Sequence, residues 1–394
     1  MKRIIAVAAA VLAASALAQQ APLRVGVIGP FTGGSADVGV PMLNGIKMAV
    51  DEINAVGGYL GRPLELVIKD DFGNPDTAAA SATELVSEKV VAAIGFCDTG
   101  VAMKAIDVFQ KGKVPLIVPC ATGTPITAKY PSPQSYIFRT SARDAIQAPF
   151  IVDDVLKRGW KRVAIFADTT GYGEAGLADV EKALAVHGIK PVYVARFQLG
   201  VRDLTPQLTA AKAAGANVVL SYTVGPENAA IANGRKAMAW RVPQVGAWPL
   251  SFPNYIDGSY GGAEGSLMAQ TFIAEPSNER RAAFLSGYVR KFSAKRIPVP
   301  MAAAQAYDAT YLLMYALLGI RDGELGGVAV KNALENIQRI YYGVVATYEK
   351  PFSLDDKEAI SENMLVVGLV KGAGVTFAYP EDAKRNLFVQ RKQQ

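Results

Sequence analysis

Short apolar runs alternate with amphipathic segments of helical period along most of this chain, and this alternation constrains the fold more than any other feature. The run at 24–29, RVGVIG, is continuously apolar, which is typical of a parallel strand that is covered on both faces. After it, Leu43, Ile46 and Val50 recur at spacings of three and four residues and form one face of a helix. The pattern predicts an α/β fold built on parallel sheets.

The alternation occurs as two consecutive series. The first predicts strands at 24–29, 64–69, 90–95 and 115–119, with a helix after each of the first three, the second of them opened by an Asn74-Pro75 cap. The second predicts strands at 162–167, 192–197 and 217–222, a last strand that ends at Trp248, and helices that include 145–158 and 173–187. Ligands of open parallel sheets bind beyond the carboxyl ends of the strands. We therefore predict two doubly wound units that face each other across one cleft.

The N-terminal residues resemble an export signal. Lys2 and Arg3 precede an apolar run at 4–14, and Ala16-Leu17-Ala18 gives the small-x-small pattern of a cleavage site. No later apolar run reaches the length of a membrane span. We expect residues 1–18 to be removed and the mature protein to lie in the periplasm.

Charge and cysteine content narrow the class of protein further. The formal charge is +6, or +4 without Lys2 and Arg3, and no block of Lys and Arg suggests binding to nucleic acid. The only two cysteines, Cys97 and Cys120, end consecutive predicted strands. They are either a disulfide or two buried thiols, and the sequence leaves both open.

No set of catalytic residues is apparent, so we expect no enzyme. The segment 171–176, GYGEAG, matches a dinucleotide-binding loop, but Glu174 would place a carboxylate where a pyrophosphate should lie. His187 is the only histidine, which excludes a His/Cys metal cluster. We predict no cofactor and no metal. An oxidoreductase that uses the GYGEAG loop and a sensor that reports to a membrane kinase are the alternatives from other classes.

Hydroxyl and small residues follow two neighbouring predicted strands. FCDTG (96–100) and PCATGT (119–124) each offer backbone N–H groups and a threonine, Thr99 and Thr122. The Thr99 amide lies near a helix start, where N–H groups lack intrahelical partners. Such a cluster suits a carboxylate, although ordinary turn chemistry also accounts for it.

Several segments in order, among them RVGVIGPFTGGSADVGVPMLNGIKMAVDEINAVGG, IGFCDTG, PLIVPCATGT and IFRTSARD, resemble the periplasmic leucine/isoleucine/valine-binding family of ABC-transporter solute receptors. The resemblance covers nearly all of the mature chain. It implies a type I periplasmic-binding fold, with two doubly wound lobes joined by a three-strand hinge. Lobe 1 would comprise 22–143 and 273–346, and lobe 2 would comprise 144–272 and 347–394.

The resemblance also implies a ligand site. Thr99 stands where the amino-acid binders hold the ligand carboxylate with a serine, and Ala121 and Thr122 match the alanine and threonine of the same site. Tyr172 matches a tyrosine that closes on the ligand, and Val38 replaces an aromatic residue of the aliphatic binders. The other residues predicted to bind ligand are Gly100, Val224 and Trp248.

Trp248 is the most informative departure from the family pattern. It stands where amino-acid binders carry the glutamate that pairs with the α-ammonium group. A buried ammonium that loses its carboxylate costs several kcal/mol, whereas tryptophan offers a flat apolar face. We therefore expect a monomeric receptor that closes over a small aromatic carboxylate resembling benzoate and delivers it to an ABC permease. The alternative is a receptor for branched-chain amino acids or small amides, in which Asp98 or Glu227 would replace the missing acid.

Overall fold

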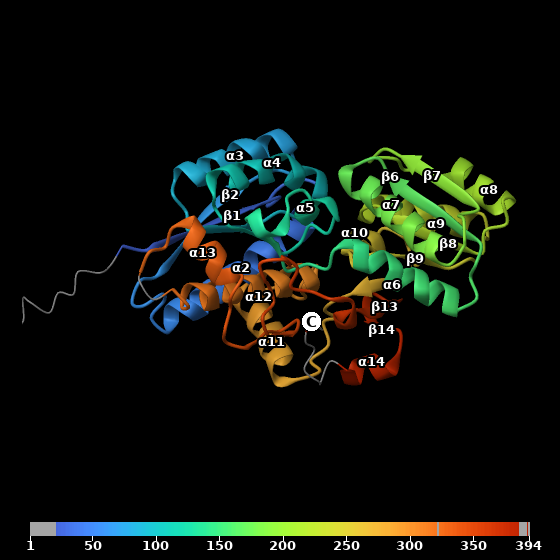
Figure 1. The fold of residues 1–394 in the computed structure, drawn as a ribbon. Coiled ribbons are helices and arrows are strands. Elements are labelled where there is room, and N and C mark those ends of the chain that lie inside the picture. Colours follow the sequence, from blue (N-terminus) through green and yellow to red (C-terminus); the bar gives the residue numbers. More distant parts are fainter. Residues whose placement is uncertain (1–20, 321–322, 386–391, 393–394) are drawn as a thin grey trace, which may run out of the picture.

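The computed structural model describes residues 21–320, 323–385 and 392, so the predicted signal peptide lies outside the described residues. Figure 1 shows two lobes side by side, each with helices packed around a sheet. Among the described residues, no helix combines the length and apolar character that crossing a membrane requires.

The first sheet has five strands in the order β2-β1-β3-β4-β5, and all of its neighbours are parallel. Its strands are β1 (Leu23–Gly29), β2 (Leu64–Asp70), β3 (Ala92–Gly95), β4 (Leu116–Val118) and β5 (Ile137–Arg139). The helical segments between them are α2 (Ala36–Ala55), α3 (Pro75–Ser87), α4 (Thr99–Gly112), α5 (Pro125–Ala128) and the 3-10 turn η1 (Ser132–Gln134).

The second sheet has seven strands in the order β14-β13-β10-β9-β8-β6-β7. Its strands are β6 (Val163–Asp168), β7 (Tyr193–Phe197), β8 (Val218–Tyr222), β9 (Gln244–Gly246), β10 (Leu267–Gln270), β13 (Val366–Lys371) and β14 (Gly374–Phe377). The first five are parallel to one another, and β13 and β14 are antiparallel additions. The accompanying helical segments are α6 (Asp144–Lys157), α7 (Gly171–Val186), α8 (Thr205–Ala213), α9 (Gly225–Ala237), η2 (Trp248–Ser251) and α10 (Pro253–Ile256).

The C-terminal third contributes to both lobes. It contains α11 (Glu279–Lys291), α12 (Pro300–Leu317), α13 (Gly327–Leu334), β11 (Tyr341–Tyr342), β12 (Thr347–Tyr348), η3 (Glu362–Met364) and α14 (Pro380–Arg385). Helix α12 lies along α2 of the first lobe, where Gly45 allows close approach because an added Cβ would lie 2.1 Å from the Ala303 carbonyl oxygen. The chain then returns to the second sheet through β13 (Figure 1).

The two lobes repeat one topology. The parallel part of each sheet follows the same order, β2-β1-β3-β4-β5 in the first and β7-β6-β8-β9-β10 in the second. The chain crosses between the sheets after β5, after β10 and before β13. The predicted type I fold, with two doubly wound lobes and three crossings, is confirmed. The residues at which each lobe begins and ends stay predictions.

Residues of alternating orientation fill the core on both sides of the first sheet. In β3, Ala92 and Ile94 pack on the side of α2 and α12, whereas Ala93 packs on the side of α3 and α4. All three side chains are fully buried. Because successive strand residues point to opposite faces, a continuously apolar strand needs helices on both sides.

Local sequence explains most element ends. The Asn74 side chain accepts hydrogen bonds from the Asp76 and Thr77 amides at 3.0 Å and caps α3 as predicted.

Two predicted element bounds in the second lobe differ from the structure. Helix α7 begins at Gly171 and not at 173, so GYGEAG forms its first turns. The predicted strand that ends at Trp248 stops at Gly246, and Trp248 opens η2.

Candidate functional site

A cavity of about 380 Å³ lies between the lobes, at the carboxyl ends of both sheets. The first lobe lines it with Gly34, Ser35, Asp37, Val38, Gly73, Pro75, Cys97, Asp98, Thr99, Gly100, Val101 and Thr122. The second lobe lines it with Thr170, Tyr172, Leu199, Val224, Pro226, Glu227, Trp248, Pro249, Phe252 and Asn254. The N-terminal ends of α2, α3, α4, α7 and α9 all reach it. Helix N-termini carry partial positive charge, so the part of the cavity surface that these five N-terminal ends form attracts anionic groups.

Two threonines of the first lobe present hydroxyl groups at the cavity. Thr99 is the first residue of α4, and its Oγ1 accepts a hydrogen bond from the Gly123 amide at 3.1 Å. Gly123 is required there, because an added Cβ would lie 2.2 Å from Thr99 Cγ2. Thr122 is 2% exposed, and among the described residues its Oγ1 has no hydrogen-bond partner, although it lies beside the Asp144 carboxyl group and lowers the pKa of that group. The Thr99 hydroxyl proton is therefore free to bind a carboxylate, and the Thr122 hydroxyl can turn to bind one.

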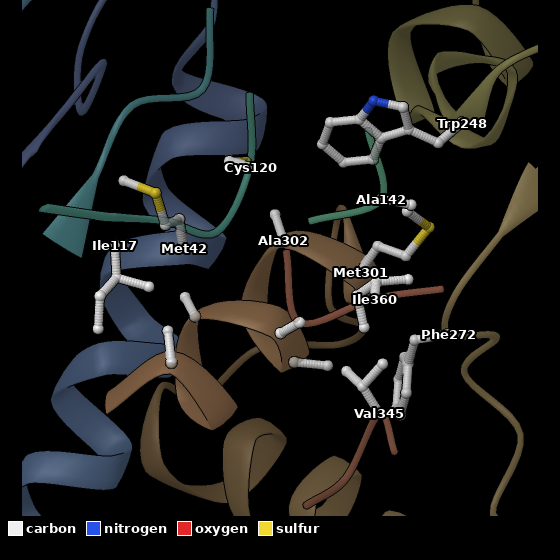
Figure 2. Close-up of a cluster of buried hydrophobic side chains, with 14 of the residues drawn as sticks. Met42, Ile117, Cys120, Ala142, Trp248, Phe272, Met301, Ala302, Val345 and Ile360 are labelled. Atoms are coloured by element: carbon white, nitrogen blue, oxygen red, sulfur yellow. The ribbon is translucent and has the colours of Figure 1, made fainter. Parts of the chain in front are cut away.

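The second lobe supplies an aromatic wall. The Trp248 and Phe252 rings meet edge to face, with centroids 4.9 Å apart. Trp248 is only 3% exposed and belongs to a core cluster that includes Cys120 and Ala142 (Figure 2). Its ring therefore both packs in the core and lines the cavity.

Tyr172 lines the cavity from the start of α7. Its ring centroid lies 5.4 Å from that of Tyr222, and its buried hydroxyl has no hydrogen-bond partner in the part of the chain that the structure describes. Burial raises the pKa of Tyr172 well above its usual value, so the hydroxyl stays protonated and can donate a hydrogen bond to a ligand.

Two acids with unpaired oxygens also line the cavity. Asp98 accepts a hydrogen bond from Ser35 Oγ at 3.1 Å through Oδ1, while its buried Oδ2 has no hydrogen-bond partner among the described residues. Glu227, which is 3% exposed, accepts one from the Gly200 amide at 2.7 Å through Oε1, and its Oε2 is likewise unpartnered. Burial raises the pKa of both carboxyl groups, and the Asp168 charge raises it further. The described residues that line the cavity include no Lys, Arg or His.

The structure brings together most of the residues predicted from the sequence. Seven of them line the cavity: Val38, Thr99, Gly100, Thr122, Tyr172, Val224 and Trp248. Ala121 does not, because it is 1% exposed and packs in the core on the side of α3 and α4. Sequence reasoning missed Ser35, Leu199, Phe252 and Asn254. The rule that loops after parallel strands form the site could have found Ser35, which follows β1.

The glycines of GYGEAG serve packing inside the protein. An added Cβ at Gly173 would lie 2.1 Å from the Asp168 carbonyl oxygen, and one at Gly176 would lie 1.9 Å from the Tyr222 ring. Glu174 forms an ion pair with Arg196 of the next strand. These contacts explain the motif without a nucleotide.

Both cysteines are free thiols in the structure. Cys97 lines the cavity, and its thiol donates a hydrogen bond to Met42 Sδ at 3.7 Å. Burial, with a smaller contribution from the neighbouring Cys120 thiol, raises the pKa of Cys97 well above its usual value, which disfavours the reactive thiolate.

The lobes touch beside the cavity. An added Cβ at Gly171, the first residue of α7, would lie 3.1 Å from the Gly100 Cα in α4. Thr124 Oγ1 of the first lobe donates a hydrogen bond to Asp179 Oδ2 of α7 at 2.6 Å. Ligand in this arrangement would be held between both lobes.

The family model and the sequence relatives that match this chain indicate the same protein family. The model of a family described as "Periplasmic binding protein" matches residues 22–373. "Leu/Ile/Val-binding protein homolog 3" of Brucella melitensis is 31% identical over 315 residues, which cover 79% of this chain and 83% of that protein. "Leu/Ile/Val-binding protein BraC3" of Rhizobium johnstonii is 30% identical over 351 residues, which cover 87% and 93%.

Solved structures share the fold at low identity. The branched-chain amino acid transporter substrate binding protein LivJ of Streptococcus pneumoniae, in complex with isoleucine, has a TM-score of 0.78 at 23% identity and covers 90% of this chain and 97% of its own. A solute binding protein of an ABC transporter from R. palustris, in complex with 4-hydroxybenzoate, has a TM-score of 0.75 at 22% identity and covers 90% and 95%.

Proposed function

This chain belongs to the periplasmic binding protein family, whose members are solute-binding receptors, and from that premise we propose that it closes over a small carboxylate with an aromatic ring resembling benzoate and delivers it to an ABC permease. The proposal places the mature protein in the periplasm as a monomer. Its mature N-terminus should then lie near Gln19, which the intact mass of the protein purified from a periplasmic extract would test.

The observation that supports an aromatic acid is the pairing of hydroxyl donors with an aromatic wall in one small cavity. Thr99 is the first residue of α4 and Thr122 lies in the loop after β4, so two hydroxyl groups and the N-terminus of α4 all favour a carboxylate. Trp248 and Phe252 supply the flat apolar surface on the opposite lobe. The cavity volume of about 380 Å³ suits a small ligand.

A specific observation also favours the second candidate, a receptor for branched-chain amino acids. The sequence suggested that Asp98 or Glu227 would have to replace the missing acid, and both line the cavity with a buried, unpartnered oxygen. An ammonium group would pair with these oxygens, and an anion without an amine would face the carboxyl groups of Asp98, Glu227 and Asp37 and no basic side chain among the described lining residues. Both ligand classes occur among the solved proteins of this fold.

A ligand panel separates the two candidates. We expect benzoate and 4-hydroxybenzoate to raise the melting temperature, whereas leucine, isoleucine and acetamide leave it unchanged. At about 100 times Kd a single-site ligand adds about 2.7 kcal/mol to the free energy of unfolding, which thermal unfolding detects easily. Stabilisation by leucine alone, lost in Asp98→Asn or Glu227→Gln, would establish the second candidate. A response to none of these ligands would contradict both.

A matched pair of variants tests the carboxylate end. Thr122→Val should weaken benzoate binding by about tenfold, because a hydrogen bond to a charged group contributes about 1.5–3 kcal/mol. Thr209→Val is the control, since Thr209 is exposed on α8 and bonds only within its own helix. Equal affinities for the two variants would contradict the assigned role of Thr122.

A further inference from the structure

Arg139 is a fully buried arginine that lies next to the cavity without lining it. It ends β5, and each of its five N–H donors has a partner. Its Nε and Nη2 donate to the two Glu358 carboxylate oxygens at 2.9 and 2.6 Å, and Nη2 also donates to Thr127 Oγ1 at 2.6 Å. Its Nη1 donates to the backbone oxygens of Thr122 and Gly123 at 2.9 and 2.8 Å.

These last two bonds help to fix the loop that carries the polar end of the cavity. The same two oxygens also accept hydrogen bonds from the Asp144 and Ile126 amides, at 2.9 and 3.1 Å. Thr122 presents its hydroxyl to the cavity, and the Gly123 amide holds Thr99 Oγ1 at 3.1 Å. The guanidinium group therefore supplies two of the four hydrogen bonds that hold these carbonyls, and it contributes to the orientation of both threonines. Lysine could not replace it, because an ammonium group has three donors and lacks the planar fork.

Glu358 fixes the guanidinium in turn. It belongs to the C-terminal segment that crosses back to the second lobe, and it is 5% exposed. That segment runs beside β5, since the Arg139 amide donates to the Lys357 oxygen at 2.8 Å and the Ala359 amide donates to the Arg139 oxygen at 2.9 Å. Removing the Glu358 charge would leave a buried cation without its partner.

We propose that Arg139 is a positioning residue for the ligand site and that Glu358 anchors it, so that a crossing segment of the C-terminal part sets the geometry of Thr99 and Thr122. The inference rests on the proposed carboxylate-binding role of these threonines. Its physical content is local order: without the ion pair, the Thr122 and Gly123 carbonyl oxygens keep only their backbone donors, the Asp144 and Ile126 amides at 2.9 and 3.1 Å, and the loop opens more often.

Hydrogen exchange of the ligand-free full chain tests this order without any ligand. In Glu358→Gln and in Arg139→Lys, we expect amides in peptides covering 119–125 to exchange about tenfold faster than in the wild type. Arg281→Lys is the control, because Arg281 is a buried arginine that also holds two backbone carbonyls, at 3.1 and 3.2 Å, but does not line the cavity. Unchanged exchange at 119–125 in Glu358→Gln, despite a lowered melting temperature, would overturn the proposal.

A double-mutant cycle tests whether Glu358 acts through Thr122. With benzoate as the probe, Glu358→Gln should weaken binding about tenfold in the wild type and by much less in a Thr122→Val background, because the hydroxyl it positions is already absent. An equal loss in both backgrounds would show a general structural role and overturn the proposal. If neither benzoate nor leucine binds the wild type, the proposed function fails, and the exchange experiment still decides the positioning role.

Discussion

Trp248 shows how one side chain can serve the core and the ligand site together. Its burial and its contact with Phe252 would suffice to explain a tryptophan at the start of η2. The same ring closes one side of the cavity, so a ligand meets a surface that the core already holds rigid. A rigid wall costs little conformational entropy on binding.

Replacing this ring should weaken an aromatic ligand more than it alters the fold. We expect Trp248→Leu to weaken benzoate binding about tenfold, because an aromatic contact contributes about 0.5–1.5 kcal/mol beyond the area it buries. Trp240→Leu is the matched control, since Trp240 is buried in a separate core cluster and does not line the cavity. Fluorescence or calorimetric titration measures both. Similar affinities in the two variants would show that Trp248 acts only in packing.

Asp144 gives the protein a specific dependence on pH. It is fully buried, and its Oδ2 has no hydrogen-bond partner among the described residues. Burial raises the pKa of Asp144 from 3.8 to about 7, and the Asp179 charge also raises it, whereas the neighbouring Thr122 and Tyr222 hydroxyl groups and the Arg139 charge oppose the shift. Between the ordinary pKa of 3.8 and the raised pKa of about 7, Asp144 is protonated in the folded protein and ionised in the unfolded chain. The free energy of unfolding therefore falls as pH rises from about 4 to 7.

The variant Asp144→Asn should remove this contribution. Its melting temperature, relative to that of the wild type, should rise between pH 4.5 and pH 7.5. Thermal unfolding of both proteins across that range measures the difference. A difference that stays constant with pH would mean that Asp144 has the same pKa in the folded and unfolded states.

The sequence predicted the hydroxyl end of the site better than its acidic end. Thr99 and Thr122 follow parallel strands, and the rule for such sheets places them at the cleft. Ala121 lies between two residues that face the other way, and no motif shows that its side chain points into the core. Whether the carboxylates of Asp98 and Glu227 point into the cavity depends on packing between distant segments, which one sequence does not display.

At the scale of elements, the βα alternation predicted strands β1 to β4 and β6 to β9 with the long helices between them, whereas β5, β10, β13 and β14 were not predicted. Strand β5 escaped notice because three residues, one of them Arg139, do not form an apolar run. Its arginine is satisfied by Glu358, which lies more than two hundred positions away in the sequence. Tertiary pairing of this kind overrides a local pattern.

The starts of α4 and α7 should limit how far the lobes close. Gly171→Val would place side-chain atoms against Gly100, where an added Cβ already lies 3.1 Å from its Cα. Overpacking costs about 1–3 kcal/mol, so ligand affinity should fall about tenfold. The melting temperature without ligand should change little if the lobes can separate. The control is Gly326→Val, since an added Cβ at Gly326 meets no atom within 4 Å. An unchanged affinity in Gly171→Val would show that this contact does not form in the complex.

At the scale of the whole molecule, two repeats of one strand order face each other across three crossing segments. Each sheet has its own helices and its own core clusters, while a shared cluster runs beneath the cavity from Met42 through Ala142 to Phe272 (Figure 2). A hinge motion of the lobes would leave the clusters that belong to one sheet closely packed and would rearrange contacts only within the shared cluster.

The chemistry of the cavity predicts that ligand drives this closure. Five polar atoms at its surface, in Asp98, Thr122, Tyr172, Glu227 and Asn254, are buried without a hydrogen-bond partner among the described residues. Each such atom costs about 1–3 kcal/mol when it is kept from water. Opening the lobes would hydrate all five, whereas a bound ligand would supply their partners and favour the closed form.

Small-angle scattering measures this closure directly. The ligand-free protein should have a larger radius of gyration than the structure described here, and a saturating ligand from the panel should reduce it to the value calculated for that structure. Gly171→Val should remain expanded at ligand concentrations that saturate it, because its side chain separates the two helix starts. Identical profiles with and without ligand, at confirmed saturation of the wild type, would exclude a hinge mechanism and leave a cavity that ligand enters without movement of the lobes.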